Sequence, residues 1–241
     1  SPESGVNRLT EELNSSEASA SRSLPADSRL LTPNSVTAII LAAGRSERMG
    51  AFKPLLSFGR KTVIETCIEH IRAGGIENVV VVLGPRAEDV KEQLKNSGVT
   101  FVINPDAASE MSASIACAVR HLSLETKAVV ITPADHPAVP SEVIATIVNE
   151  WQRGARLIVP TWNERGGHPV LIDLSFRDEL LSLDPRRGLK VLFDAHRDEV
   201  RRVPVDSNFI ARDMDTWDDY RALHEEVFGV PPPKPMFRGQ K

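Results

Sequence analysis

Short apolar runs rich in Val and Ile alternate with amphipathic stretches along most of this chain. The runs occupy residues 37–41, 78–83, 100–103, 128–132, 156–159, 169–172 and 200–205. Apolar residues at helical spacing fill 62–72, 87–95, 112–122, 141–152, 188–195 and 216–228. Near-continuous apolar strands joined by helices are typical of a sheet buried on both faces. The alternation therefore predicts an α/β fold with a mainly parallel sheet between two layers of helices.

Both ends of the chain differ from this pattern. Residues 1–35 are rich in Ser, Glu, Ala and Asn and show little apolar periodicity, which predicts a flexible N-terminal extension. Residues 231–241 begin with Pro231-Pro232-Pro233, which cannot continue a helix and predicts an extended Pro-rich tail. Because no internal repeat or linker stands out between them, we expect a single domain over residues 36–230.

Composition narrows the classes of partner. A net charge of -4 and a pI near 5.9 argue against a general binder of nucleic acid or acidic membranes, and favour a small anionic ligand held in a local basic pocket. No apolar run approaches the roughly 18 residues of a membrane helix. The two cysteines, Cys67 and Cys117, lie in helical patterns, so we expect free thiols in a soluble protein of the reducing cytoplasm.

The loop that follows the first predicted strand has the composition of a phosphate site. It carries three small residues and three cations, namely Ala42, Ala43, Gly44, Arg45, Arg48 and Lys53. Small residues let backbone N–H groups approach an anion, and the cations donate charge-assisted hydrogen bonds to phosphate oxygens. Ser46 stands where the dinucleotide fingerprint needs its second glycine, and Ala51-Phe52 follow Gly50 where a P-loop needs Lys-Ser/Thr. The spacing predicts a different nucleotide-binding loop.

A carboxylate follows the predicted strand 128–132. Asp135 lies between Pro133 and Pro137, whose fixed φ angles stiffen the loop. Mg²⁺ prefers oxygen ligands and often binds through one or two carboxylates plus substrate phosphates, so Asp135 is our leading metal ligand. A turn or helix N-cap aspartate is the alternative that this motif alone leaves open. His136 has no nucleophile nearby to activate, and a structural role is expected for it.

Two more polar segments stand near predicted strands and helices. Gly166-Gly167-His168 precedes the strand 169–172, and a plain Gly-Gly turn explains it as well as a ligand site does. An acidic cluster opens the last predicted helix, where Thr216 or Asp215 suits the N-cap position. The start of the helix does not require both Asp213 and Asp215, so these two aspartates are candidates for a function.

Taken together and in order, these segments resemble the molybdenum cofactor nucleotidylyltransferase family (MobA-like NTP transferase domain), in its cytidylyltransferase-like branch. The motifs that carry the resemblance are Leu41-Ala42-Ala43-Gly44-Arg45-Ser46-x-Arg48-Met49-Gly50-x-x-Lys53, Met111-Ser112-Ala113-Ser114-Ile115, Asp135-His136-Pro137, Gly167-His168-Pro169-Val170 and Asp213-Met214-Asp215-Thr216. They span roughly residues 37–220. The opening signature is shared with many nucleotidyltransferases, whereas Gly-His-Pro narrows the choice to the molybdopterin-type branch.

The resemblance implies a Rossmann-like three-layer α/β/α fold of the nucleotide-diphospho-sugar transferase type and a Mg²⁺-dependent transfer of CMP from CTP to the terminal phosphate of molybdopterin, with release of pyrophosphate. Asp135 and Asp215 would bind Mg²⁺ and, with Lys53, form the catalytic set. The nucleotide would contact Leu41, Ala42, Ala43, Gly44, Arg45, Ser46, Arg48, Met49, Gly50, Lys53 and Ser112. Gly167, His168 and Pro169 would face the acceptor.

Three residues depart from the family pattern. Glu110 stands where glycine is usual before Met-Ser, His136 where glutamine is common, and Trp217 where proline is often found. A carboxylate at position 110 would repel an anionic acceptor. The catalytic set itself is intact.

Several functions remain open at this stage. GTP as donor and a sugar phosphate as acceptor are the nearest alternatives to CTP and molybdopterin. A non-catalytic nucleotide sensor or a cofactor-binding chaperone is the alternative of another class, against which the intact Lys53, Asp135 and Asp215 argue. The expected partners are a nucleoside triphosphate, a phosphate-bearing acceptor and a recipient molybdoenzyme, with no nucleic acid and no membrane.

Overall fold

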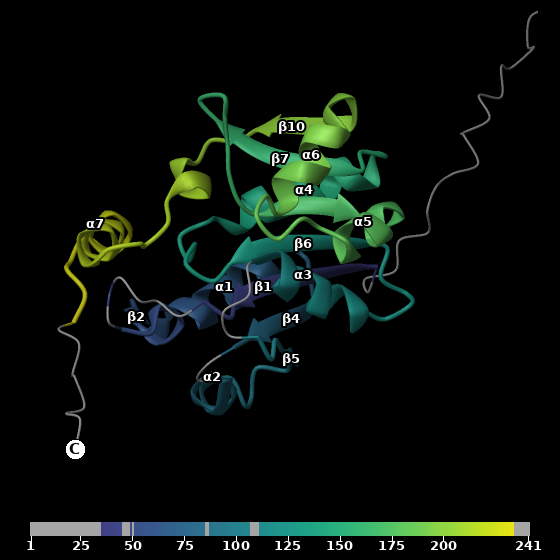
Figure 1. Ribbon diagram of the computed structural model, residues 1–241. Coiled ribbons are helices and arrows are strands. Elements are labelled where there is room, and N and C mark those ends of the chain that lie inside the picture. Colours follow the sequence, from purple (N-terminus) through teal and green to yellow (C-terminus); the bar gives the residue numbers. More distant parts are fainter. Residues whose placement is uncertain (1–34, 45–48, 50, 85–86, 107–110, 234–241) are drawn as a thin grey trace, which may run out of the picture. The chain divides into compact units, whose positions relative to one another are not determined.

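A computed structural model describes residues 35–44, 49, 51–84, 87–106 and 111–233 (Figure 1). They all belong to one compact unit, Leu31–Lys241. The expected extension apart from Ser35, the tail from Lys234 onward, and the site candidates Arg45, Ser46, Arg48 and Gly50 lie outside the described residues, as does Glu110.

In the described part of the chain, eight strands form one sheet, in the order β10-β7-β9-β6-β1-β4-β5 with β8 paired to β7 (Figure 1). Their bounds are β1 Val36–Ala42, β4 Asn78–Leu83, β5 Thr100–Ile103, β6 Ala128–Pro133, β7 Leu157–Trp162, β8 Arg165–Gly166, β9 Val170–Asp173 and β10 Val200–Pro204. The strands β1, β4, β5 and β6 pair in parallel, and so do β7 and β10. The expectation of a mainly parallel sheet is confirmed.

Strand β9 runs antiparallel to both of its neighbours, β6 and β7. The cause is a tight reversal after β7, at Asn163 and Glu164, which both have positive φ angles. Two residues suffice for a hairpin but not for the crossover that a parallel strand needs. The chain therefore turns at residues 163–164, ahead of the Gly166-Gly167 pair where the sequence indicated a turn, and Gly166 lies in β8.

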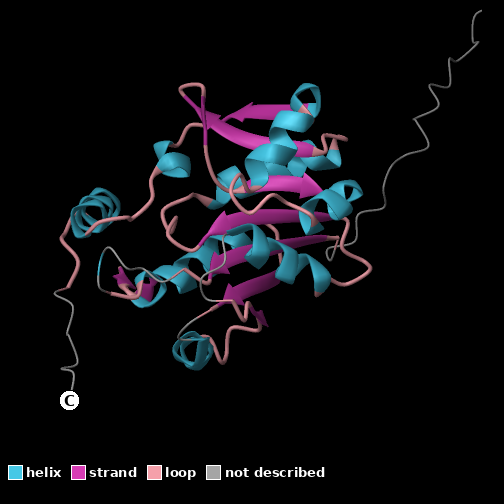
Figure 2. Ribbon diagram, viewed as in Figure 1, coloured by secondary structure: helices cyan, strands magenta, loops and turns pink. Residues whose placement is uncertain are grey.

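Side chains alternate between the two faces of the sheet, and each face is covered by helices (Figure 2). Ala38 and Ile40 pack with α1 (Val63–Ala73), α2 (Ala87–Gln93) and α4 (Ser141–Gln152). Ile39 packs on the opposite face with α3 (Met111–Arg120), α5 (Arg177–Leu181) and α6 (Leu189–Ala195). This arrangement is the predicted three-layer α/β/α fold. None of the described helices has the length and apolar character needed to cross a membrane.

Among the described residues, the elements that the sequence did not predict are all short. They are β2 (Ser57–Phe58), β3 (Lys61–Thr62), β8, α5, and the 3-10 turns η2 (Lys53–Leu55), η3 (Leu174–Phe176), η4 (Arg197–Glu199) and η5 (Asn208–Ala211). A segment of two to five residues is too short to show a periodicity, and tertiary contacts decide its conformation.

The last helix, α7 (Trp217–Phe228), packs beside the β2–β3 hairpin instead of on the main sheet. Buried Phe58 and Tyr220 belong to one small apolar cluster, and the Tyr220 hydroxyl donates to the Ser57 carbonyl at 2.5 Å. The His224 Nε2 accepts a hydrogen bond from the Gly59 N–H at 3.2 Å. A capping box between Thr216 and Asp219 starts the helix. These contacts fix where the segment before α7 lies.

A buried hydrogen bond anchors the antiparallel strand β9 to α4. Trp151 Nε1 donates to Asp173 Oδ2 at 2.8 Å, while Asp173 Oδ1 accepts from the Ser175 N–H at 2.9 Å. We predict that Trp151→Phe lowers the free energy of unfolding by about 1–3 kcal/mol, because it removes a donor from a buried carboxylate. Urea denaturation followed by circular dichroism measures the loss.

The matched control is Trp162→Phe. Trp162 is partly exposed, and its indole makes no hydrogen bond with the residues that the structure describes, so the same change of atoms should cost less there. An equal loss in both variants would show that the Trp151–Asp173 bond does not anchor β9.

Candidate active site

The order of the strands reverses at β1, because the chain proceeds from β1 to β4 and β5 and then returns to place β6 on the other side of β1. Ligands of open α/β sheets bind outside the carboxyl ends of the strands at such a reversal. Leu41 pairs with Pro133 there, and the Ala134 N–H donates to the Leu41 carbonyl at 3.0 Å. The loops that follow β1 and β6 therefore begin side by side.

Lys53 contacts both of the other predicted catalytic residues, Asp215 and Asp135. Its Nζ lies 2.8 Å from Asp215 Oδ1 and 3.4 Å from Asp135 Oδ2. The two aspartates are 162 and 82 residues away from it in the sequence. Only 13% of the Lys53 side chain is exposed, so solvent screens these ion pairs less than it would on an open surface. The sequence identified these three residues by their motifs, and the structure shows that their side chains are in contact.

Asp135 is held in its ionised form. Its burial opposes ionisation, but the hydrogen bond from His136 and the positive charge of Lys53 outweigh burial and lower the pKa of its carboxyl below the ordinary value. His136 Nδ1 lies 2.9 Å from Asp135 Oδ1, and because a carboxylate only accepts, this nitrogen carries the proton. Each oxygen of Asp135 therefore has its own donor, and the expected structural role of His136 is to orient this carboxylate.

The placement of Asp215 depends on its neighbours in the segment before α7. Met214 is fully buried in the same small cluster as Met49, Phe58 and Tyr220. Trp217 Nε1 donates to the Met49 carbonyl at 2.9 Å, which ties the loop after β1 to the first turn of α7. Asp213, by contrast, is exposed and makes no hydrogen bond or ion pair with the described residues. Of the two surplus aspartates, only Asp215 reaches Lys53.

The antiparallel direction of β9 brings its amino end to the carboxyl end of β6. The His168 N–H donates to the Ile210 carbonyl at 2.8 Å, and the peptide bond to Pro169 is cis. The His168 ring lies 5.2 Å from the His136 ring, edge to face. The predicted acceptor motif therefore lies beside the predicted metal ligand.

The His168 side chain is neutral near pH 7. Burial and the neighbouring His136 lower the pKa of its imidazole to about 4, against the opposing effects of Asp135 and the Ile131 carbonyl. Its Nδ1 is buried and has no hydrogen-bond partner among the described residues. A buried nitrogen of this kind is costly unless a ligand or water satisfies it.

The predicted nucleotide side is described in part. Leu41 and Ala42 end β1, Ala43 and Gly44 follow, and Met49 is buried. Ser112 lies in the first turn of α3 with a buried hydroxyl that has no partner in the described part of the chain. Gly44 is exposed, and a Cβ there would meet no atom of the described residues within 4 Å, so the backbone at Gly44 is open to a ligand.

Sequence reasoning missed two residues that shape this side. A Cβ on Gly84 would lie 2.7 Å from the Ala43 carbonyl oxygen, so glycine at the end of β4 permits the close approach of the loop. Asn104 donates from Nδ2 to Ser114 Oγ at 2.9 Å and accepts from the Asp106 N–H at 3.1 Å. The signals were a glycine after β4 and an Asn-Pro pair after β5, both directly at strand ends.

The donor set fits a magnesium ion that is shared with phosphates. Asp135 and Asp215 are both within reach of one ammonium nitrogen, and no group of three or more His, Cys, Asp or Glu side chains suited to a metal occurs among the described residues. Mg²⁺ commonly takes one or two carboxylates and completes its shell with water and substrate phosphate. The set does not fit a metal held by protein ligands alone.

Both cysteines are free, as expected, and Cys67 lies beneath this site. Its Sγ is 3.8 Å from the Ala134 carbonyl oxygen. Burial, with a smaller contribution from Asp135, raises the pKa of the Cys67 thiol to about 12. A thiol of this kind is not a nucleophile at neutral pH.

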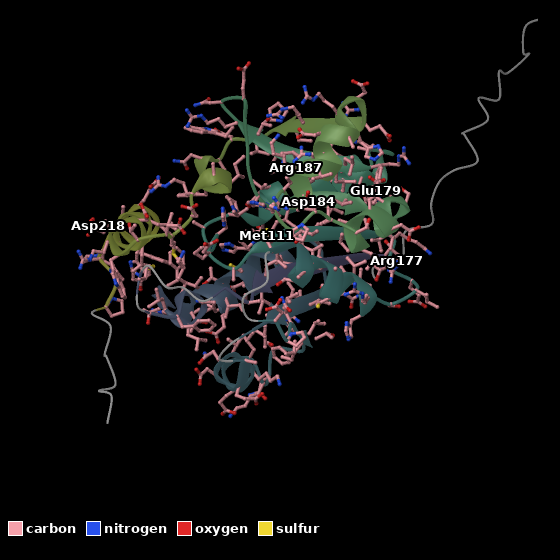
Figure 3. The ribbon with its side chains drawn as sticks, viewed as in Figure 1. Met111, Arg177, Glu179, Asp184, Arg187 and Asp218 are labelled. Atoms are coloured by element: carbon pink, nitrogen blue, oxygen red, sulfur yellow. The ribbon has the colours of Figure 1, made fainter. Side chains whose placement is uncertain are left out.

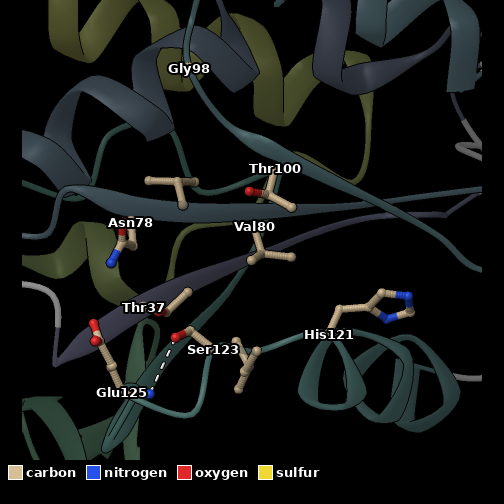
Figure 4. A pocket seen from close by; sticks show the side chains of 10 residues that line it. Thr37, Asn78, Val80, Gly98, Thr100, His121, Ser123 and Glu125 are labelled. Carbon is tan, nitrogen blue, oxygen red and sulfur yellow. Dashed lines mark hydrogen bonds between the residues drawn. The ribbon is translucent and has the colours of Figure 1, made fainter.

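A separate hollow of about 350 Å³ lies at the opposite edge of the sheet (Figure 4). Thr37, Asn78 and Thr100, at the amino ends of β1, β4 and β5, line it together with His121 and Glu125. It shares no residue with the Lys53 site.

Known proteins are similar in sequence to most of this chain. The model of the MobA-like NTP transferase domain matches residues 38–200, which is more than half of the chain. The chain is 27% identical to a molybdenum cofactor cytidylyltransferase of Escherichia coli over 80% of this chain and 97% of that protein. It is 29% identical to a molybdenum cofactor guanylyltransferase of Polynucleobacter asymbioticus, over 67% of this chain and 82% of that protein.

A solved structure is also similar. The crystal structure of Rv0371c of Mycobacterium tuberculosis in complex with manganese has a TM-score of 0.69 and 27% identity, over 80% of this chain and all of that one. The matched domain ends at residue 200, before Asp215 and α7.

Gly167 offers a test of how the acceptor motif is held. A Cβ there would lie 2.2 Å from the Ile210 carbonyl oxygen, the atom to which His168 is bonded. We predict that Gly167→Ala lowers the free energy of unfolding by about 1–3 kcal/mol through steric overlap, measured by urea denaturation.

Gly44→Ala is the control for stability, because its Cβ meets no atom of the described part of the chain within 4 Å. If Gly167→Ala were as stable as Gly44→Ala, the close approach to Ile210 would not hold the motif in place.

Proposed function

The chain belongs to the family of MobA-like NTP transferase domains and is a nucleotidyltransferase, and from that premise we propose that it transfers CMP from CTP to the terminal phosphate of molybdopterin or its molybdenum-loaded form. An oxygen of the acceptor phosphate attacks the α-phosphorus of CTP in line. The new P–O bond forms as the bond to the β-phosphate breaks, and pyrophosphate leaves.

The observation that carries this proposal is the convergence of Lys53, Asp135 and Asp215 at the carboxyl ends of β1 and β6. Lys53 is placed to offset charge that accumulates on the oxygens of the reacting phosphate. Arg45 and Arg48 belong to the same proposed set by their motif. Mg²⁺, bound by Asp135 and Asp215, would supply further charge stabilisation on the α-phosphate and the acceptor phosphate.

The remaining roles are part of the same proposal. The backbone of Leu41–Ala43 and the side chain of Ser112 contact the nucleotide, and Gly167, His168 and Pro169 face the acceptor. The neutral His168 ring suits contact with an uncharged part of the acceptor, such as its ring system, better than contact with its phosphate. No side chain is needed as a nucleophile, because an acceptor phosphate is already ionised near neutral pH and positioning carries the chemistry.

The choice of CTP rests on similarity over most of the chain to a cytidylyltransferase. The guanylyltransferase relative makes GTP the alternative donor, and a sugar phosphate is the alternative acceptor. We predict that pyrophosphate release with molybdopterin has a higher kcat/KM for CTP than for GTP by at least about tenfold, a difference that one or two base contacts supply. Higher efficiency with GTP would make the protein a guanylyltransferase, and equal efficiency would show that it does not select between the two bases. Turnover only with sugar phosphates would exclude molybdopterin.

Asp135→Asn tests the catalytic assignment. The variant keeps the size of the side chain and an oxygen that accepts from His136, so we expect the fold to persist while kcat falls by about a hundredfold or more. Pyrophosphate release measures turnover, and circular dichroism checks the fold.

Asp218→Asn is the matched control. Asp218 lies on α7 only a few residues from Asp215, but it points outward and its side chain is 93% exposed (Figure 3). It should keep full activity. Full activity in Asp135→Asn would instead remove Asp135 from the catalytic set.

A further inference from the structure

We propose that the Lys53 ammonium is a resident counter-ion of the proposed metal site, which a divalent cation must displace from the two carboxylates. The protein alone then binds the cation weakly, and it binds it well once a triphosphate offers the ammonium another partner. This inference rests on the proposed function, since it concerns the same two aspartates, and it adds an order to the binding of nucleotide and metal.

Each carboxylate oxygen of Asp135 faces a different donor, His136 or Lys53. Oδ1 accepts from His136 at 2.9 Å, and Oδ2 faces Lys53 at 3.4 Å. The oxygen that is left for a cation is therefore the one that Lys53 already approaches. Asp215 Oδ1, at 2.8 Å from the same nitrogen, is occupied in the same way.

A divalent cation and the ammonium compete for these oxygens. Mg²⁺ binds carboxylate oxygens at about 2.0–2.1 Å, which would place it next to Nζ. Like charges at such separations repel strongly where water screens them little, and the Lys53 side chain is only 13% exposed. Cation binding with Lys53 in place is therefore penalised.

The side chain of Lys53 can leave while its backbone stays. Pro54 of η2 is buried, and the Lys53 carbonyl accepts from the Leu56 N–H at 3.1 Å, so the turn is anchored. The long alkyl stem permits the ammonium to swing toward phosphate oxygens. A nucleotide that captures the ammonium frees both carboxylates, so nucleotide and cation strengthen each other's binding, and linkage makes this effect reciprocal.

The test uses Mn²⁺ alone as the probe and measures its dissociation constant by electron paramagnetic resonance of the free ion. Lys53→Met removes the ammonium and keeps most of the stem. We expect it to bind Mn²⁺ at least about tenfold more tightly than the unaltered protein in the absence of nucleotide. A lysine that serves only as a phosphate ligand or a structural link would give no such gain.

Lys61→Met is the control for the loss of one positive charge. Lys61 pairs with Glu69 at 2.6 Å on the surface, and its side chain is 47% exposed. It should leave the Mn²⁺ dissociation constant within about twofold. Circular dichroism establishes that both variants fold.

A double variant identifies the site of the gain. Adding Asp135→Asn to Lys53→Met should abolish the tighter binding. Unchanged or weaker Mn²⁺ binding by Lys53→Met would overturn the proposal, as would a gain that survives in the double variant or appears equally in Lys61→Met. The readout needs no turnover, so its failure is distinct from a failure of CMP transfer, which pyrophosphate release reports separately.

Discussion

The arrangement of this site depends on one ammonium group. Lys53 Nζ lies between two carboxylates that come from opposite ends of the chain's second half, and neither carboxylate lies near it in sequence. Three segments must therefore be positioned together. The η2 turn carries Lys53, the Pro133–Pro137 loop carries Asp135, and the residues just before α7 carry Asp215. Attraction between these opposite charges favours the arrangement, but packing elsewhere places each residue.

The packing that places Asp215 lies apart from the main sheet. Met214, Tyr220 and Phe58 form a small cluster between α7 and the β2–β3 hairpin, and Trp217 bonds to the backbone of Met49. Trp217 therefore links the loop after β1 to the segment that carries Asp215. Through this link, a helix that follows the matched domain helps to place Asp215 beside Lys53, which lies within that domain.

Much of the fold was readable from the sequence, for a physical reason. A buried strand must be apolar along its whole length and a covering helix apolar along one stripe, so β1, β4, β6, α1 and α4 appear as local patterns. The direction of β9 could not be predicted from such a local pattern. Its apolar run is identical for either direction, and only the two-residue turn at Asn163 and Glu164 makes it antiparallel.

The sequence by itself determined the class of fold, the order of the elements and the residue types available for phosphate and cation chemistry, because these follow from local composition and spacing. Tertiary structure alone decided which of them meet. It separated Asp215 from the exposed Asp213, gave Asp135 one donor for each oxygen, and brought His168 to the carboxyl end of β6 by reversing β9. Those outcomes depend on contacts between segments far apart in the chain, and no local pattern encodes them.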